Sequence, residues 1–183
     1  MNTKQPIIIE LNMQKMARDN IIWTIVLIIF TVLLNSLIHQ RFTANFSLFD
    51  FFYLILAYIV LIILHEVFHL IGFMVFGGAS YKELDYGVNL KLGVAYATTN
   101  KPLSNAAMKK ALLLPLWTTG IVPTIAGFYV NSTVLLLAGA FLIAGAVGDI
   151  AMYKELRKYP KNALIQDDPQ LPKLYVYAPQ KKS

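Results

Sequence analysis

The residues best equipped for chemistry are His65, Glu66 and His69, which form an HExxH pentapeptide. Residues four apart lie one above the other on a helix, so both imidazoles can reach one metal ion. Glu66 lies beside that face, where it can take a proton from a water molecule on the metal. Two histidines from one helix and a third ligand from elsewhere leave one position of a tetrahedral zinc ion open. This pattern is typical of HExxH metalloproteases.

The pentapeptide lies within an apolar part of the chain. Residues 51–64 before it and 70–76 after it include no charged residue. Ionisable groups inside such a stretch are costly unless they are paired or bound, so a functional role is the first interpretation. The alternative is a structural polar cluster without a metal. We favour metal ligation because the apolar context excludes a solvated helix face.

The composition is that of a polytopic membrane protein. The chain has 183 residues, of which 57% are hydrophobic and 14% charged, and its mean hydropathy is +0.56. These values exclude an ordinary soluble domain. The absence of cysteine excludes disulfides, cysteine-ligated metals and thiol catalysis.

Four apolar stretches approach the roughly 20 residues that a helix needs to cross a bilayer. We therefore expect an all-α polytopic membrane protein with a small β-hairpin between its second and third spans. No small-residue cleavage site follows the first span, so no removable signal peptide is expected. Pro115 and Pro123 predict a kink or break in the third span. The expected parts are a cytosolic lead at 1–20, a four-span membrane domain at 21–152 with spans at about 21–38, 48–76, 111–130 and 133–152, a hairpin at about 81–98, and a cytosolic tail at 153–183.

The net charge of +6 is distributed as membrane flanks rather than as a nucleic-acid surface. In the four-span arrangement, fifteen of the sixteen basic residues lie on one side, and only Arg41 lies on the other. Cytosolic loops of membrane proteins carry an excess of lysine and arginine. We therefore expect both termini in the cytosol, a lipid bilayer as surroundings, and no nucleic-acid partner.

The segment 79–110 is the long non-apolar stretch between the spans. Within it Leu92, Val94 and Tyr96 alternate with small or polar residues, and this period of two favours a strand. Such a strand can pair its edge with an extended substrate, so these three residues are candidates for substrate binding. The alternative is a plain cytosolic loop, because strand signals depend on context.

The third metal ligand is sought among the ionisable groups within the apolar runs, which are His65, Glu66, His69 and Asp149. Asp149 lies near the cytosolic end of the fourth span, at a depth similar to that of the pentapeptide. Small residues at 144–148 are expected to let this span approach the second one closely. The alternative is that Asp149 caps a helix end or pairs with Lys154.

Together these features resemble the putative zincin peptidases, a family of small bacterial membrane proteins related in design to site-2 proteases. The resemblance is carried by HExxH in the second span, Gly72 three residues later and Gly148-Asp149 in the last span, and it covers most of the chain from about Leu48. It implies a zinc-dependent membrane-embedded endopeptidase with His65, His69 and Asp149 as metal ligands and Glu66 as general base. Site-2 proteases usually read Leu-Asp-Gly at the aspartate, where this chain has Gly148-Asp149-Ile150.

The expected function is hydrolysis of peptide bonds in membrane or membrane-proximal proteins, with Zn²⁺ as the cofactor and a membrane protein or peptide as the partner. A non-enzymatic metal-binding adaptor or carrier subunit is the alternative. A carrier needs polar groups along a path through the membrane, and the first and third spans offer few. Small-residue faces on the third and fourth spans permit a homo-oligomer.

Overall fold

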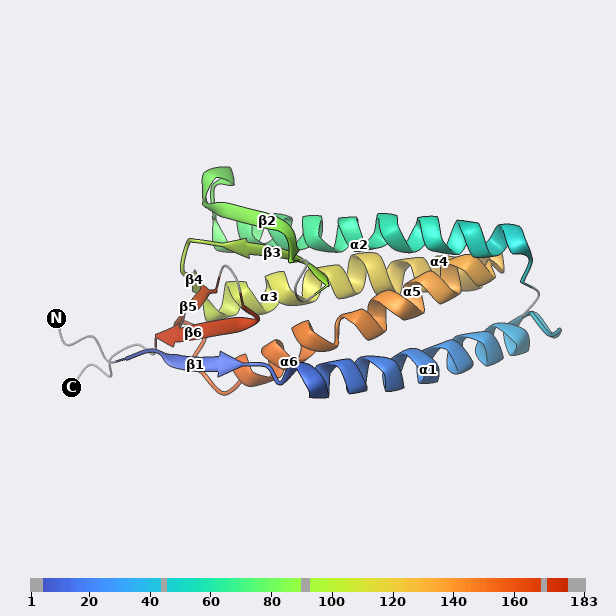
Figure 1. Ribbon diagram of the computed structural model, residues 1–183, viewed down its shortest axis with the longest axis horizontal. Coiled ribbons are helices and arrows are strands. Elements are labelled where there is room, and N and C mark those ends of the chain that lie inside the picture. Colours follow the sequence, from blue (N-terminus) through green and yellow to red (C-terminus); the bar gives the residue numbers. More distant parts are fainter. Residues whose placement is uncertain (1–4, 44–45, 90–92, 169–170, 178–183) are drawn as a thin grey trace. The chain divides into compact units, whose positions relative to one another are not determined.

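The computed structural model describes residues 5–43, 46–89, 93–168 and 171–177, and they form mostly helices with two small sheets (Figure 1). Four helical segments are long and apolar enough to cross a membrane, judged by length and composition: Met13–Ile38, Leu48–Gly77, Asn105–Val130 and Thr133–Leu156. The helices are α1 (Met13–Ile38), α2 (Leu48–Gly77), α3 (Asn105–Pro115), α4 (Val122–Val130), α5 (Thr133–Gly145) and α6 (Val147–Leu156), with a 3₁₀ turn η1 (Tyr81–Glu83) and a π-helical segment η2 (Leu116–Ile121). The strands are β1 (Ile7–Glu10), β2 (Leu84–Asn89), β3 (Val94–Thr99), β4 (Leu103–Ser104), β5 (Leu164–Asp167) and β6 (Lys173–Tyr177).

The chain divides into two compact units, each made of segments distant in sequence. The first, here called the sheet unit, comprises Met1–Asn12, Glu66–Leu114 and Gly148–Ser183. The second, the helix unit, comprises Met13–His65 and Pro115–Val147. The division falls inside the continuous helix α2, between His65 and Glu66.

In the helix unit, α5 packs against α1 on one side and against η2 and α4 on another. The apolar side chains of α1 are mostly exposed, while its buried positions are polar: Thr31 and Asn35. Asn35 Nδ2 donates to Asn131 Oδ1 at 2.8 Å, so a polar contact joins α1 to the turn before α5. This pattern of polar residues inside and apolar residues outside is expected where lipid replaces water.

Two of the apolar segments are interrupted rather than straight. The expected irregularity of the third span is present, because α3 ends at Pro115 and the π-helical η2 follows it before α4. The fourth span was expected to be one helix, but α5 ends at Gly145 and α6 begins at Val147. Asn20 Nδ2 donates to the Ala144 carbonyl at 3.0 Å beside this interruption. A side chain of α1 thus satisfies a backbone carbonyl at the end of α5.

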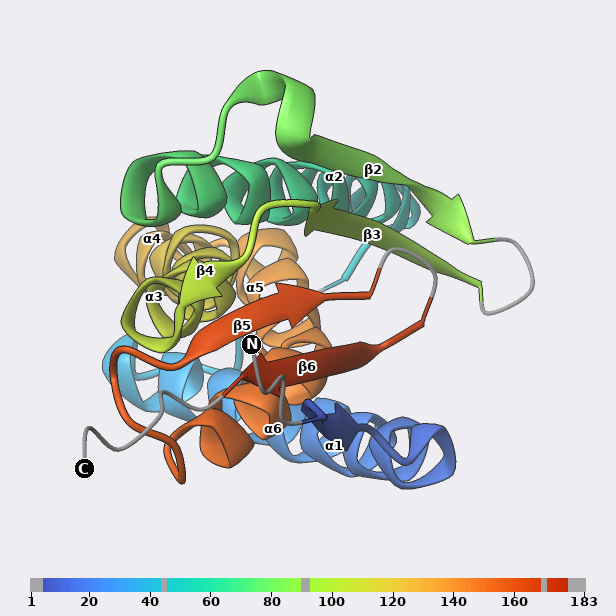
Figure 2. The same ribbon diagram turned by 90° about the vertical axis from the view of Figure 1, so that its left-hand side faces the viewer.

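The sheet unit contains a four-stranded antiparallel sheet in the order β1-β6-β5-β4 (Figure 2). Its first strand lies in the expected lead and its β5 and β6 in the expected tail, with Ile9 opposite Leu174 and Ile165 opposite Val176. Alternate residues of these strands point into the core. The core of this unit includes the side chains Ile9, Phe73, Leu103, Ala107, Met108, Ala111, Leu112, Ile165, Leu174 and Val176.

The second sheet of the sheet unit is the hairpin of β2 and β3. Tyr96 lies opposite Gly87, and a Cβ built at Gly87 would be 3.0 Å from the Tyr96 hydroxyl. The Gln166 amide of β5 donates to the Thr99 carbonyl at 3.3 Å, so the end of β3 is tied to the four-stranded sheet.

Candidate metal centre

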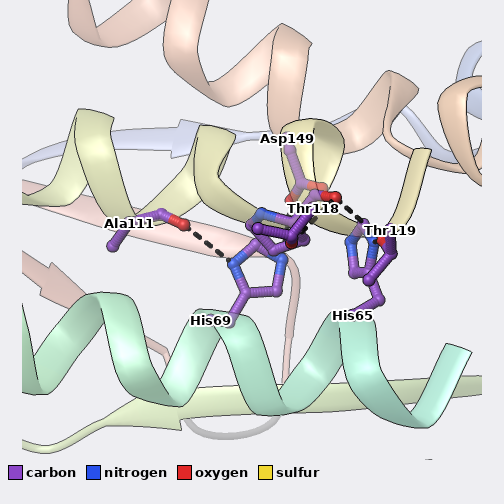
Figure 3. A network of polar contacts seen from close by, with 7 residues as sticks. His65, His69, Ala111, Thr118, Thr119 and Asp149 are labelled. Atoms are coloured by element: carbon purple, nitrogen blue, oxygen red, sulfur yellow. Dashed lines mark hydrogen bonds and ion pairs between the residues drawn. The ribbon is translucent and has the colours of Figure 1, made fainter. Parts of the chain in front are cut away.

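The two histidines of the pentapeptide lie on one face of α2 (Figure 3). His65 is 8% exposed and His69 7%, although the apolar residues Leu64 and Val67 between and beside them are exposed. The helix is unbroken from Leu48 to Gly77, so the spacing of four residues places the rings one turn apart. The apolar face of α2 therefore points outward, and its imidazole face points into the protein.

Asp149 lies in the first turn of α6. Its Oδ1 atom is 3.5 Å from His69 Nε2, and its side chain is 20% exposed. The first turn of a helix has unpaired N–H groups and a positive dipole end, both of which favour a carboxylate. The interruption before Val147 is thus what puts Asp149 at a helix start. The two glycines of this stretch make no close helix contact, because a Cβ at Gly145 would meet no described atom within 4 Å and one at Gly148 would be 3.8 Å from the Leu11 side chain.

His65, His69 and Asp149 each offer one ligand atom, and these three atoms lie within 4.8 Å of one another. Ligands of tetrahedral zinc lie about 2.0–2.2 Å from the ion and hence roughly 3.4 Å apart. The separation of 3.5 Å between His69 and Asp149 matches that value. Two imidazoles and a carboxylate are also the donor types of catalytic zinc sites that keep one position open. The donor set therefore fits zinc.

The Nδ1 atom of each histidine lies within hydrogen-bond distance of an oxygen atom. His69 Nδ1 donates to the Ala111 carbonyl at 3.2 Å, since a carbonyl can only accept (Figure 3). His65 Nδ1 is 3.2 Å from Thr119 Oγ1, and this hydroxyl donates its own proton to the Pro115 carbonyl at 2.8 Å. The Thr119 oxygen therefore accepts from His65. Both rings therefore carry a proton on Nδ1, and Nε2 is the ring nitrogen that can ligate a metal; in His69 this atom faces Asp149 Oδ1.

The other residues proposed from the sequence lie as follows. Glu66 is half-buried on α2, one residue after His65. Tyr96 is half-buried on β3, whereas Leu92 and the side chain of Val94 are outside the described part of the structure. His39 belongs to a different place, where its Nε2 donates to the Phe128 carbonyl at 3.0 Å.

Sequence reasoning missed Ala111 and Thr119, which act through a carbonyl and a hydroxyl, and it also missed Asp167. Asp167 is the last residue of β5, two residues after the buried Ile165, so it lies on the inner face of the sheet. Burial raises the pKa of Asp167 to about 7, and the charges of His69 and Asp149 act on it in opposite directions. A carboxylate of the tail therefore lies within electrostatic reach of the centre. Its signal in the sequence is its position two residues after Ile165, which puts both side chains on the same face of a strand.

Comparisons with known proteins give one match. No curated protein and no solved structure matches the chain. The family model described as "Putative zincin peptidase" matches residues 58–164, which is more than half of the chain. The matched segment includes the HExxH pentapeptide and Asp149, while α1 and β6 lie outside it. The chain therefore belongs to the Putative zincin peptidase family, a family of metallopeptidases.

Proposed function

We propose that the protein is a zinc-dependent, membrane-embedded endopeptidase that hydrolyses peptide bonds of membrane or membrane-proximal proteins. The observation that carries the proposal is the group of His65, His69 and Asp149, whose ligand atoms converge on helices that are otherwise apolar. Family membership supports the peptidase class, and the composition of the four long helices supports a membrane location.

His65, His69 and Asp149 would hold the zinc ion. Bound zinc polarises the scissile carbonyl and makes water more acidic, which is the chemistry that this metal supplies in hydrolases. Glu66 is adjacent to a ligand and half-buried, so its carboxylate is positioned to act as general base. It takes a proton from the attacking water and then delivers one to the leaving amine.

The substrate would bind in an extended conformation. A helix keeps its peptide groups in internal hydrogen bonds, so a spanning substrate must be unwound locally before cleavage. Among the described strands β3 forms a ladder only with β2, and Gln166 of β5 contacts its end at the Thr99 carbonyl. The part of its other backbone edge before Thr99 is where an added strand would pair. We assign substrate binding to Val94 and Tyr96 of β3 and to Leu92, which precedes them in the sequence. Thr98, on the same strand, is 4% exposed and its hydroxyl has no partner within the described residues.

The proposed setting is a bacterial cell membrane with both termini in the cytosol, because fifteen of the sixteen basic residues fall on the side of the termini. The partner is a membrane protein or peptide substrate, and a second copy of the chain is a further candidate partner.

The first experiment compares Glu66→Gln and Asp149→Ala with the wild-type protein, purified in detergent and supplied with zinc. We expect about one zinc per chain in the wild type and in Glu66→Gln, because glutamine changes no ligand. Asp149→Ala should lose zinc or bind it at least tenfold more weakly. Cleavage of a single-span test substrate should be abolished in Glu66→Gln, since proton transfer typically contributes 10²–10⁴-fold.

The outcomes separate the enzyme from the adaptor. Wild-type cleavage by Glu66→Gln would remove that residue from the role of base. Zinc binding without any cleavage by the wild type would favour a metal-binding adaptor. Retention of zinc by Asp149→Ala would require another third ligand.

A further inference from the structure

The apolar segment 105–130 contains two prolines, and only one of them lies beside the metal centre. Pro115 ends α3, and Pro123 is the second residue of α4. Proline has no backbone N–H, so the carbonyl four residues earlier loses its usual helical donor. For Pro115 that carbonyl belongs to Ala111, and for Pro123 it belongs to Thr119. Inside a membrane such a carbonyl requires a different donor.

The donor to the Ala111 carbonyl is the imidazole of His69. Its Nδ1 atom is 3.2 Å from the oxygen, and Ala111 is fully buried. The approach is made possible by Gly72, because a Cβ at that position would be 2.8 Å from the Ala111 Cα atom. The pair Gly72 and Ala111 therefore lets α2 and α3 touch through their backbones, one turn from the ring of His69.

Pro115 also affects the hydrogen bonding of His65, in this case through its own carbonyl rather than through its missing N–H. The Pro115 oxygen accepts from Thr119 Oγ1 at 2.8 Å, so the threonine hydroxyl has no second proton to donate. His65 Nδ1, 3.2 Å from that hydroxyl, must then be the donor. Ala111, Pro115 and Thr119 follow one another at intervals of four, as do His65 and His69.

We propose that Pro115 is a positioning residue for both histidines, because its missing N–H frees the Ala111 carbonyl for His69 and its carbonyl fixes the Thr119 hydroxyl for His65. Both imidazoles are thereby held with Nδ1 donating to an oxygen of the segment 111–119, so that Nε2 is the ring nitrogen that can ligate a metal. The inference rests on the proposed zinc site, but it concerns how the two imidazoles are oriented before the metal binds. Partners of this kind commonly change metal affinity by 10–100-fold.

The test measures zinc affinity of the full-length protein in detergent by competition with a chelator. Pro115→Ala restores an N–H that competes with His69 for the Ala111 carbonyl, and zinc affinity should fall about tenfold. The visible absorption of the Co²⁺ form should change as well. The thermal midpoint of the metal-free protein should stay the same or rise, because alanine favours a helix interior more than proline does. A purely structural role for Pro115 predicts a lower midpoint instead.

Pro123→Ala is the matched control, since it makes the same chemical change in the same segment but restores a donor to the Thr119 carbonyl, whereas the histidine contact of Thr119 is made by its hydroxyl. Its zinc affinity and Co²⁺ spectrum should equal those of the wild type. Thr119→Val removes the hydroxyl behind His65 with little change of shape, and should weaken zinc binding independently of any folding defect in Pro115→Ala.

Wild-type affinity in both Pro115→Ala and Thr119→Val would overturn the inference while leaving the zinc site in place. An equal loss in Pro115→Ala and Pro123→Ala would overturn it too. Absence of zinc binding in the wild type would instead overturn the proposed function and, with it, this inference.

Discussion

At the scale of single residues, buried polar side chains of the sheet unit differ in whether hydrogen bonds and nearby charges compensate for the cost of their burial. His69 donates to a carbonyl and lies against Asp149, and its ring stacks on Phe73 with 6.3 Å between the centroids. Asp167 is different, because burial dominates over the interactions that favour its ionised form. Its ionisation therefore opposes folding in the metal-free protein.

The pH dependence follows from this pKa. Asp167 titrates near 3.8 when unfolded and at about 7 in the folded chain, so the folded state retains a proton that the unfolded state has lost. Stability from this group is present below about pH 4 and is lost as the pH rises through 7. His69, Asp149 and Asp168 are the charged groups that act on it.

We predict that Asp167→Asn raises the thermal midpoint of the metal-free protein at pH 8 and has progressively less effect towards pH 5. Asparagine resembles the protonated acid and carries no charge to desolvate. The measurement is thermal unfolding in detergent across this range. Glu155→Gln, at an exposed position of α6, is the control and should show no such trend. A benefit that does not grow with pH would mean that Asp167 is not destabilised by burial.

At the scale of elements, the contact between α2 and α3 sets the geometry of the centre. Gly72 and Ala111 meet through backbone atoms, and Gly72 lies one turn beyond His69 on α2. A larger residue at either position must separate the helices, and the hydrogen bond from His69 to Ala111 would lengthen.

We predict that Gly72→Ala destabilises the protein by about 1–3 kcal/mol, the usual range for overpacking a tight contact. Zinc affinity should fall together with stability, because the same displacement moves His69. The control is Gly145→Ala, where a Cβ meets no described atom within 4 Å, and its effect should be small. Thermal unfolding and chelator competition measure the two quantities. Unchanged zinc affinity in Gly72→Ala would show that the helix contact does not control the ligand.

At the scale of the whole molecule, the charge distribution predicts an orientation. The chain has no cysteine, so single cysteines can be introduced without background labelling. We predict that Arg41→Cys reacts with a membrane-impermeant maleimide on intact cells and that Lys158→Cys reacts only after lysis. The cysteine-free parent is the control. The opposite pattern would reverse the proposed topology.

Much of the helical architecture, and the candidate residues that the structure brings together, could be predicted from the sequence, because the helices and the pair of histidines depend on local spacing. HExxH places two histidines on one helix face through helical periodicity alone, and Asp149 is conspicuous as a charge within an apolar stretch. The four-stranded sheet could not be predicted in the same way, since it pairs Glu10 with Lys173 across nearly the whole chain. Ala111 contributes a backbone oxygen, and every residue type has one, so the identity of Ala111 does not predict this role. Pro115, four residues later, does indicate it, because proline has no N–H to donate to that oxygen.

The pairing of β1 with β6 has a consequence for the order of events during synthesis. Leu174 and Val176 of β6 fill the same core as Phe73 and Ala111, the neighbours of His69. The ribosome delivers these strand residues after all four apolar helical segments. A chain still in synthesis therefore has both histidines on α2 before the core beside His69 is complete. The core of the sheet unit is consequently completed late in synthesis, and a chain stalled before β6 would carry the motif without its finished surroundings.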